Sequence, residues 1–147
     1  MVAHGIKGMT FLGIHTWNGP GLLSIGGRGA EGVVFVDAFF TEDPKVKTFV
    51  EGFQKEYRRK PETLEALCYD GAKLLAELIL SKSPSTPLEM KEELLRVSDY
   101  RGVSGLMGFS EHGTPIRKLT IYSVKNGKIV PPLPLILSPM RRENRES

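Results

Sequence analysis

A single cysteine stands among the 147 residues, which excludes an intramolecular disulfide and any metal site built from several cysteines. That residue, Cys68, lies in an apolar stretch with helical spacing, and we expect it to be buried as a small apolar side chain. The three histidines do not stand at a metal-binding spacing from one another or from a carboxylate. The sequence therefore predicts neither a metal nor another cofactor.

Motifs of catalysis are lacking as well, since the chain has no nucleophile elbow and no phosphate-binding loop. The glycine-rich run Gly26-Gly27-Arg28-Gly29 follows a short helix pattern and leads into a strand pattern. Phosphate binding requires the reverse order, a glycine loop that opens a helix. We expect that the protein is not an enzyme.

Charge of one sign and long apolar runs are both scarce. The net charge is only +3 and the basic residues are dispersed, whereas nucleic-acid binding needs a clustered basic face. The longest apolar stretch near the end, residues 130–137, contains three prolines and is far shorter than the roughly 20 residues that cross a bilayer. No signal-peptide pattern follows Met1. Nucleic acid is therefore not an expected partner, and no transmembrane segment is predicted.

The first third of the chain has the pattern of two strands around a short helix. Residues 9–14 are apolar and predict a buried strand that needs neighbours on both sides. Residues 20–26 predict a short helix that begins at a proline and ends at a glycine pair. Residues 32–36 then predict a second buried strand.

Three longer helices follow in the predicted order. Asp43-Pro44 supplies an N-cap and a first-turn proline for a helix that runs to about Arg58. A second helix after Lys60-Pro61 has one wide apolar face made by Leu64, Leu67, Cys68, Gly71, Leu74, Leu75 and Leu78. Thr86-Pro87-Leu88-Glu89 has the spacing of a capping box and opens the third helix, to about Val97.

The rest of the chain has β patterns. A strand is predicted around residues 106–109, a turn at Glu111-His112-Gly113, and a second strand over residues 119–124. Asn126-Gly127 predicts a hairpin whose return strand is residues 128–130. The fold class is therefore α/β, with three main helices, short buried strands and a C-terminal β-hairpin. The tail at residues 131–147 is Pro-rich and then charged, and we expect it to be irregular.

Several of these segments stand in a distinctive order. They are Phe11-Leu12-Gly13, Gly26-Gly27, Ala30-Glu31-Gly32-Val33-Val34-Phe35, Asp43-Pro44-x-Val46-x-x-Phe49-Val50, Ala66-Leu67-Cys68-Tyr69-Asp70-Gly71-Ala72, Gly102-Val103-Ser104-Gly105 and Phe109-Ser110-Glu111-His112-Gly113. In this order, the stretch from residue 5 to about 130 resembles the C-terminal portion of type I periplasmic solute-binding proteins, the branched-chain amino acid (Leu/Ile/Val) binding proteins of ABC transporters. The segments Trp17-Asn18-Gly19-Pro20 and Asp37-Ala38-Phe39-Phe40 resemble a branch of lipoproteins that activate peptidoglycan synthases.

The resemblance implies a two-lobe α/β protein with its ligand in a cleft between the lobes. Residues 1–130 would be the C-terminal part of such a module, so this chain would be an incomplete partial fold. The implied function is that of a periplasmic or envelope solute-binding component, whose partners are an amino acid or another small polar metabolite and a transporter permease. The alternative is an envelope protein-interaction module of the same fold, without a transport role. We also expect self-association, because strands that lack neighbours expose hydrogen-bonding edges.

Two loops match cleft positions of that family. Open α/β sheets bind ligands beyond the carboxyl ends of their strands, so the loop after the first strand and the chain after the second strand are the candidates. The candidate ligand-binding residues are His15, Thr16, Trp17 and Asn18 in the first loop, and Asp37, Phe39 and Phe40 after the second strand.

His15 departs from the family pattern, because amino-acid-binding relatives commonly place an acidic residue there to pair with the ligand's ammonium group. A neutral imidazole does not supply the charge-assisted bond of a carboxylate, whereas Asp37 could substitute. The other interpretation of His15 is an exposed loop residue bonded to backbone. Trp17 either forms a wall of the cleft or packs on the neighbouring helix. Phe39 and Phe40 cannot both face the core from an extended chain, so one is expected to line the cleft.

Overall fold

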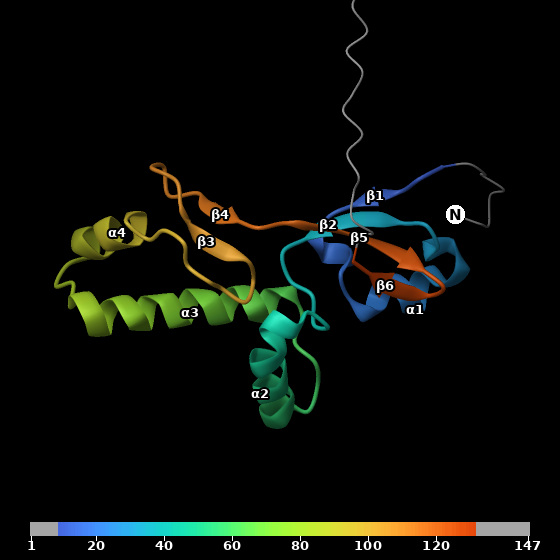
Figure 1. The fold of residues 1–147 in the computed structure, drawn as a ribbon, viewed down its shortest axis with the longest axis horizontal. Coiled ribbons are helices and arrows are strands. Elements are labelled where there is room, and N and C mark those ends of the chain that lie inside the picture. Colours follow the sequence, from blue (N-terminus) through green and yellow to red (C-terminus); the bar gives the residue numbers. More distant parts are fainter. Residues whose placement is uncertain (1–8, 132–147) are drawn as a thin grey trace, which may run out of the picture.

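The computed structural model describes residues 9–131, which fold into two small sheets and four α-helices (Figure 1). The helices are α1 (Pro20–Gly26), α2 (Lys47–Tyr57), α3 (Thr63–Lys82) and α4 (Pro87–Leu95). The strands are β1 (Leu12–Gly13), β2 (Val34–Asp37), β3 (Leu106–Phe109), β4 (Pro115–Arg117), β5 (Thr120–Lys125) and β6 (Lys128–Val130). The predicted α/β class and the three main helices are confirmed. The predicted tail lies outside the described residues, except for Pro131.

The larger sheet has the strand order β1-β2-β5-β6. β1 is parallel to β2, whereas β5 is antiparallel to both β2 and β6. Three helices and the smaller sheet are therefore inserted between two neighbouring strands, β2 and β5. Figure 1 shows the result, with the larger sheet and α1 on one side of the molecule and α3, α4 and the β3–β4 pair on the other.

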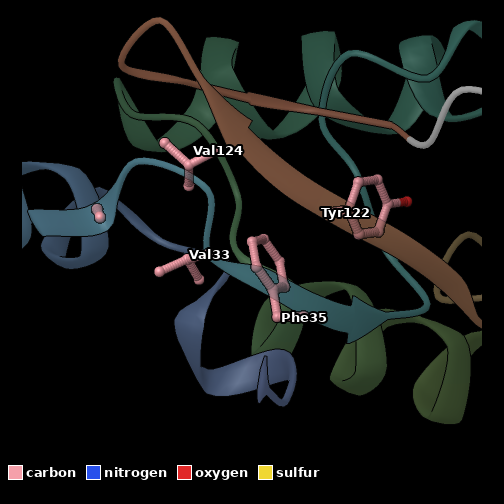
Figure 2. Close-up of a cluster of buried hydrophobic side chains, with 5 residues drawn as sticks. Val33, Phe35, Tyr122 and Val124 are labelled. Carbon is pink, nitrogen blue, oxygen red and sulfur yellow. The ribbon is translucent and has the colours of Figure 1, made fainter. Parts of the chain in front are cut away.

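One face of the larger sheet is buried beneath α1. Val33, Phe35, Tyr122 and Val124 lie in one cluster (Figure 2), and α1 contributes Leu22 and Leu23. Phe35 and Tyr122 are cross-strand partners with ring centroids 5.7 Å apart. Each fully buried side chain of this size stabilises the fold by roughly 1.5–3 kcal/mol. This packing explains why the alternating residues of β2 are buried on one side.

The opposite face of this sheet is open among the described residues. Leu12, Ile14 and Ile121 are all exposed, with Leu12 at 77%. The prediction of a buried strand at residues 9–14 is therefore wrong in its burial, although β1 does form there. These residues are exposed because β1 is an edge strand, paired with β2 alone within residues 9–131, and because α1 covers only the other face of the sheet.

The predicted start signals of the helices are confirmed. The Asp43 carboxylate accepts a hydrogen bond from the Lys45 backbone N–H at 2.9 Å, and Pro44 opens a 3₁₀ turn that continues into α2. Thr86 caps α4 by accepting from the Glu89 N–H at 3.2 Å. The Glu89 carboxylate accepts from the Ser85 N–H and not from Thr86, so the capping box is only half formed. These caps fix the entry points of α2 and α4.

The apolar face predicted for the second helix is only partly covered. Leu74 and Leu78 of α3 are buried, together with Leu106 of β3, whereas Leu64, Leu75 and Ile79 are exposed. Cys68 is exposed too, so the prediction of a buried cysteine is wrong. Helical spacing shows which side of α3 is apolar, but Cys68 lies on a part of that side that neither β3 nor α4 covers.

The β5–β6 hairpin follows from local turn chemistry. Asn126 and Gly127 have φ values of 52° and 68°, which is the left-handed backbone that Asn-Gly adopts in a two-residue hairpin. The Glu31 carboxylate accepts from both of their N–H groups, at 2.9 and 3.2 Å. The β5–β6 hairpin is confirmed, whereas β4, the partner of β3, was not predicted.

Candidate functional site

Asp37 lies at the point where the chain leaves the larger sheet towards α2. Its side chain is 1% exposed, and both carboxylate oxygens accept hydrogen bonds. Oδ2 accepts from Thr63 Oγ1 at 2.6 Å and from Asn18 Nδ2 at 2.7 Å. Oδ1 accepts from the Ala38 N–H at 2.6 Å and weakly from the Phe39 N–H at 3.4 Å. One carboxylate therefore joins the sheet, the loop after β1 and the start of α3.

Asn18 is held in one orientation by two acceptors. Its amide nitrogen donates to Asp37 and also to the Phe39 carbonyl oxygen at 2.6 Å. A flipped amide would place its oxygen against these two oxygens, so the nitrogen must face them. The Asn18 carbonyl oxygen accepts no hydrogen bond from the described residues and is not among the buried unpaired atoms. It is therefore an accessible acceptor.

A cavity of about 700 Å³ lies next to Asn18, within the usual size of small-molecule sites. It is formed where the start of α1, the chain after β2, the loop between α2 and α3, and β6 come together. Its lining residues are Asn18, Gly19, Pro20, Leu23, Phe39, Phe40, Thr41, Glu42, Arg59, Lys60, Pro61, Glu62, Lys128 and Ile129. We take this cavity, here called the junction cavity, as the candidate site.

Phe39 and Phe40 alternate as expected for neighbours in an extended chain. Phe39 is 1% exposed and packs with Val46, Val50 and Ala66. Phe40 is only partly buried and lies against the Tyr122 ring, with centroids 5.2 Å apart. Both residues line the junction cavity, but the Phe39 side chain is buried in the core. The Phe40 ring therefore gives the cavity its aromatic wall.

Charged side chains of both signs border the cavity on its other side. Lys60 and Glu42 form an ion pair at 2.6 Å, and the Arg59 guanidinium donates to Glu65. The Glu62 carboxylate lies beside Gly19, since a Cβ at that glycine would be 3.7 Å from Glu62 Oε2. Lys128 adds a cation from β6. The cavity therefore combines an apolar wall with groups that can bind either charge.

The Arg59–Glu65 pair gives a prediction for the pH dependence of stability. The hydrogen bond from Arg59 lowers the pKa of Glu65 below its usual value of 4.5. A lowered pKa in the folded state contributes stability above pH 4.5 that disappears as the pH falls through the lowered value. Because Arg59 is half exposed, we expect Glu65→Gln to cost at most about 1 kcal/mol at pH 7.

Urea unfolding of Glu65→Gln and of the unmodified protein at pH 7 and pH 3 checks this. The difference in the free energy of unfolding should be smaller at pH 3 than at pH 7, because the fall in pH brings Glu65 closer to protonation. Glu56→Gln, a change of an exposed carboxylate on α2, is the control and should differ little at either pH. A Glu65→Gln effect that is equally large at pH 7 and pH 3 would contradict the assignment.

Three of the predicted site residues in the loop after β1, His15, Thr16 and Trp17, do not border the junction cavity. His15 and Thr16 are exposed in a 3₁₀ turn after β1. Trp17 is partly buried and packs against the Phe35–Tyr122 cluster. The structure thus brings together four of the seven predicted residues, with Asn18, Phe39 and Phe40 at the cavity and Asp37 beneath them. Their contact with a ligand stays a prediction.

Trp17 owes its position to Gly13. A Cβ at residue 13 would lie 2.3 Å from a carbon of the Trp17 ring, which is far inside van der Waals contact. We expect Gly13→Ala to displace the indole and to lower the free energy of unfolding by about 1–3 kcal/mol, the usual cost of overpacking. Because Trp17 is the only tryptophan, its fluorescence spectrum reports the displacement directly. Gly21→Ala is the control, since nothing lies within 4 Å of a Cβ there; an equal effect of both changes would contradict the expectation.

A second cavity, of about 880 Å³, lies between the chain after β2, the loop before β3 and the chain that leads from β4 into β5. Its lining includes Lys45, Arg101, Lys118 and Tyr122, and burial raises the pKa of the Tyr122 hydroxyl. Of the predicted site residues it contains only Phe40. We therefore place the candidate site in the smaller junction cavity.

Asp70 on α3 is, like Asp37, a buried carboxylate that accepts several hydrogen bonds. It is 1% exposed and accepts from the Val103 N–H at 2.8 Å, the Ser104 N–H at 2.7 Å and Ser104 Oγ at 2.5 Å. A Cβ at Gly102 would lie 2.3 Å from Asp70 Oδ2, so a glycine is needed there. Asp70 is therefore a structural hydrogen-bonding residue that ties α3 to the loop before β3.

Several residues of the site were missed by sequence reasoning. Thr63 was part of a predicted helix start, but nothing in the sequence pairs it with Asp37. Arg59 and Glu62 stand beside the recognised Lys60-Pro61 helix break, which was a usable signal. Lys128 gave no signal, because its place at the cavity depends on the pairing of β6 with β5.

The comparison with protein families decides the identity. A family model described as "Periplasmic binding protein" matches residues 2–128. The chain belongs to the periplasmic binding protein family. The predicted family is thereby confirmed, and the similarity to peptidoglycan synthase activators stays a prediction. A search of proteins of curated function finds no match.

Solved structures of this family have the same fold as the chain. It is similar to a leucine binding protein from Thermotoga maritima, with 27% identity, a TM-score of 0.74, and coverage of 90% of this chain and 38% of that protein. A putative branched-chain amino acid ABC transporter protein from Rhodospirillum rubrum gives 25% identity, a TM-score of 0.76, and coverage of 89% and 39%. A branched-chain amino acid transporter substrate binding protein from Streptococcus pneumoniae was solved in complex with isoleucine. It gives 25% identity, a TM-score of 0.70, and coverage of 89% of this chain and 40% of that protein.

This periplasmic binding protein chain therefore spans about two fifths of the length of these relatives. Over residues 9–131, no helix is long and apolar enough to cross a membrane. The same residues hold no group of three or more His, Cys, Asp or Glu side chains placed to share a metal ion.

Proposed function

We propose that this chain is part of a solute-binding component of an ABC transporter and that a small polar solute such as an amino acid binds in the junction cavity. The observation that carries the proposal is the cavity itself, where an oriented Asn18 meets an aromatic wall and charges of both signs. Its size suits a metabolite, and the solved relatives include proteins described as binding leucine and isoleucine. A periplasmic or envelope location and a permease partner belong to the same proposal.

The geometry supports a zwitterionic ligand. The accessible carbonyl oxygen of Asn18 and the nearby Glu62 carboxylate would accept from an ammonium group. Lys128 would bind the carboxylate, and Phe40 and Leu23 would contact an apolar side chain. Asn18 and Glu62 would then take the place of the acidic residue that stands at the His15 position in amino-acid-binding relatives. Asp37 would keep its four hydrogen bonds.

Calorimetric titration with the twenty amino acids and a panel of small polar metabolites tests the proposal. We expect one class of solute to bind and Lys128→Gln to weaken its binding about tenfold, since a hydrogen bond to a charged group contributes about 1.5 kcal/mol. Lys125→Gln, on the same hairpin but away from the cavity, is the matched control. Absence of heat and of thermal stabilisation across the whole panel would count against solute binding.

The alternative is an envelope protein-interaction module without transport. It is favoured by the exposed His15-Thr16 turn, which stands where amino-acid-binding relatives commonly place an acid. Cross-linking from that turn in envelope extracts would return a defined protein partner under this alternative. A chain that binds a solute and yields no cross-linked partner would exclude it.

A further inference from the structure

The second cavity lies apart from the proposed solute site and has its own set of charges. Its volume of about 880 Å³ is within the usual range of small-molecule sites. Lys45 lines it from the 3₁₀ turn before α2, Arg101 from the loop before β3, and Lys118 from the chain between β4 and β5. Cations from three separate segments of the chain therefore meet at one cavity.

None of these three cations forms an ion pair with a carboxylate among residues 9–131. In the junction cavity, by contrast, the side chains of Arg59 and Lys60 each pair with a glutamate. A cation without a carboxylate partner keeps its hydrogen-bond donors for a ligand, and charge-assisted hydrogen bonds are stronger than neutral ones. The second cavity therefore offers cationic donors that the described residues do not use in ion pairs.

Two carboxylates also line the second cavity, those of Asp43 and Asp99. Asp43 is already engaged, because its carboxylate accepts from the Lys45 backbone N–H at 2.9 Å. Three cations and two carboxylates leave one excess positive charge. A single carboxylate on a ligand would neutralise this charge, whereas a ligand ammonium group would add to it.

Hydrogen bonds fix the backbone that carries two of the cations. On both sides of Arg101, the N–H groups of residues 100 and 102 donate to carbonyl oxygens of β3, at 2.8 and 3.1 Å. The Lys118 N–H donates to the Gly105 carbonyl oxygen at 2.9 Å, and a Cβ at Gly105 would lie 2.7 Å from the Lys118 carbonyl oxygen. The two segments are thus in close contact, and little backbone ordering is left for a ligand to impose.

Apolar side chains line another part of the second cavity. They are Ala38 and Phe40 from the chain after β2, Val103 from the loop before β3, and Met107 of β3. Three of them are partly buried and Met107 is 41% exposed, so none is enclosed in the core. An apolar body bound against them would be removed from water, which favours binding.

We propose that the second cavity binds a small organic monocarboxylate, with its carboxylate held by Arg101 and Lys118 and its apolar body against Phe40 and Met107. The excess charge and the apolar lining together define this class of ligand. A phosphate ion has no body to contact the apolar side chains, and an amino acid brings an ammonium group to a cavity that already has excess positive charge. The site goes beyond the proposed solute site, which takes a zwitterion in the junction cavity.

Calorimetry at constant ionic strength with four matched probes tests the proposal. Hexanoate should bind. Hexanamide has the same chain without the charge, norleucine adds an ammonium group, and inorganic phosphate has no apolar body; each should bind at least about tenfold more weakly than hexanoate. Arg101→Gln and Lys118→Gln should each weaken hexanoate binding about fivefold or more, because each removes a hydrogen bond to a charged group.

Two lysines of the β5–β6 hairpin supply matched controls. Lys125→Gln changes a residue that lines neither cavity, and Lys128→Gln changes one that lines the junction cavity. Each should change hexanoate binding less than about twofold, and urea unfolding should show that all four variants are folded.

The proposal is overturned if hexanoate does not bind, if any of the other three probes binds as tightly, or if Lys128→Gln weakens hexanoate binding as much as Lys118→Gln does. The last result would place hexanoate in the junction cavity. Because the test uses no zwitterionic ligand except as a comparison, failure of solute binding in the junction cavity leaves its outcome unaffected.

Discussion

Replacing Asp37 with alanine is expected to lower the free energy of unfolding by about 3–5 kcal/mol. The carboxylate is buried and accepts hydrogen bonds from Thr63, Asn18 and two backbone N–H groups. Without it, the Thr63 hydroxyl and the N–H groups of residues 38 and 39 lose their acceptor in a place from which water is excluded. Each unsatisfied buried donor costs about 1–3 kcal/mol, and hydrogen bonds to a charged group are the stronger ones.

Urea unfolding of Asp37→Ala and of the control Asp43→Ala measures the effect. Asp43 is also an aspartate whose carboxylate accepts from backbone, but it caps an exposed helix start, so its loss should cost only about 1 kcal/mol. If the two changes cost the same, Asp37 does not join the elements as described. A double-mutant cycle with Thr63→Val should show a coupling of about 0.5–3 kcal/mol, because the two side chains bond directly.

The parts of the fold that the sequence predicted are those with a local cause. Asp43-Pro44 and Thr86-Pro87 contain their own capping chemistry, and Asn126-Gly127 adopts the left-handed backbone that its turn needs. Each signal is complete within about four residues, so no knowledge of distant contacts is required. The order of the segments carried the family resemblance, and the resemblance implied a fold that no single local pattern contains.

The errors arose where burial depends on a distant neighbour. The apolar residues of residues 9–14 and of α3 fit a buried strand and a buried face, yet Leu12, Cys68 and Leu75 are exposed. Periodicity shows which side of an element is apolar, but whether that side is covered depends on other parts of the fold.

The candidate site likewise contains residues that a local pattern predicted and residues that depend on distant parts of the fold. Asn18, Phe39 and Phe40 were predicted because they follow strands, and they do border one cavity. Thr63 and Lys128 come from elements far away in the sequence and carry no motif. Asp37 was predicted as a ligand contact, and the structure gives its carboxylate four hydrogen bonds inside the protein. One of these bonds orients Asn18, and contact of Asp37 with a ligand stays a prediction.

Replacing Asp70 with alanine is expected to cost about 3–5 kcal/mol and to release the loop before β3 from α3. The Asp70 carboxylate accepts from the Val103 and Ser104 N–H groups and from the Ser104 hydroxyl. The Arg117 guanidinium in turn donates to Ser104 Oγ at 2.6 Å. The Ser104 hydroxyl thus lies between the buried Asp70 carboxylate and the Arg117 guanidinium of β4 and is hydrogen-bonded to both. Removing the anion leaves three donors without an acceptor beside a cation.

Urea unfolding of Asp70→Ala, Ser104→Ala and the double variant checks this arrangement. Ser104→Ala alone should cost about 1 kcal/mol, and the double variant should cost less than the sum, since both changes break one network. Glu77→Ala is the control, because Glu77 lies on the same helix in an exposed pair with Lys73 and should cost at most about 0.5 kcal/mol. Hydrogen exchange should show faster exchange of the Val103 and Ser104 amides in Asp70→Ala, while amides around Leu74 keep their protection. Additive effects of Asp70 and Ser104, or unchanged exchange at residues 103 and 104, would mean that the loop is held by the packing of Leu106 on α3 and not by the carboxylate.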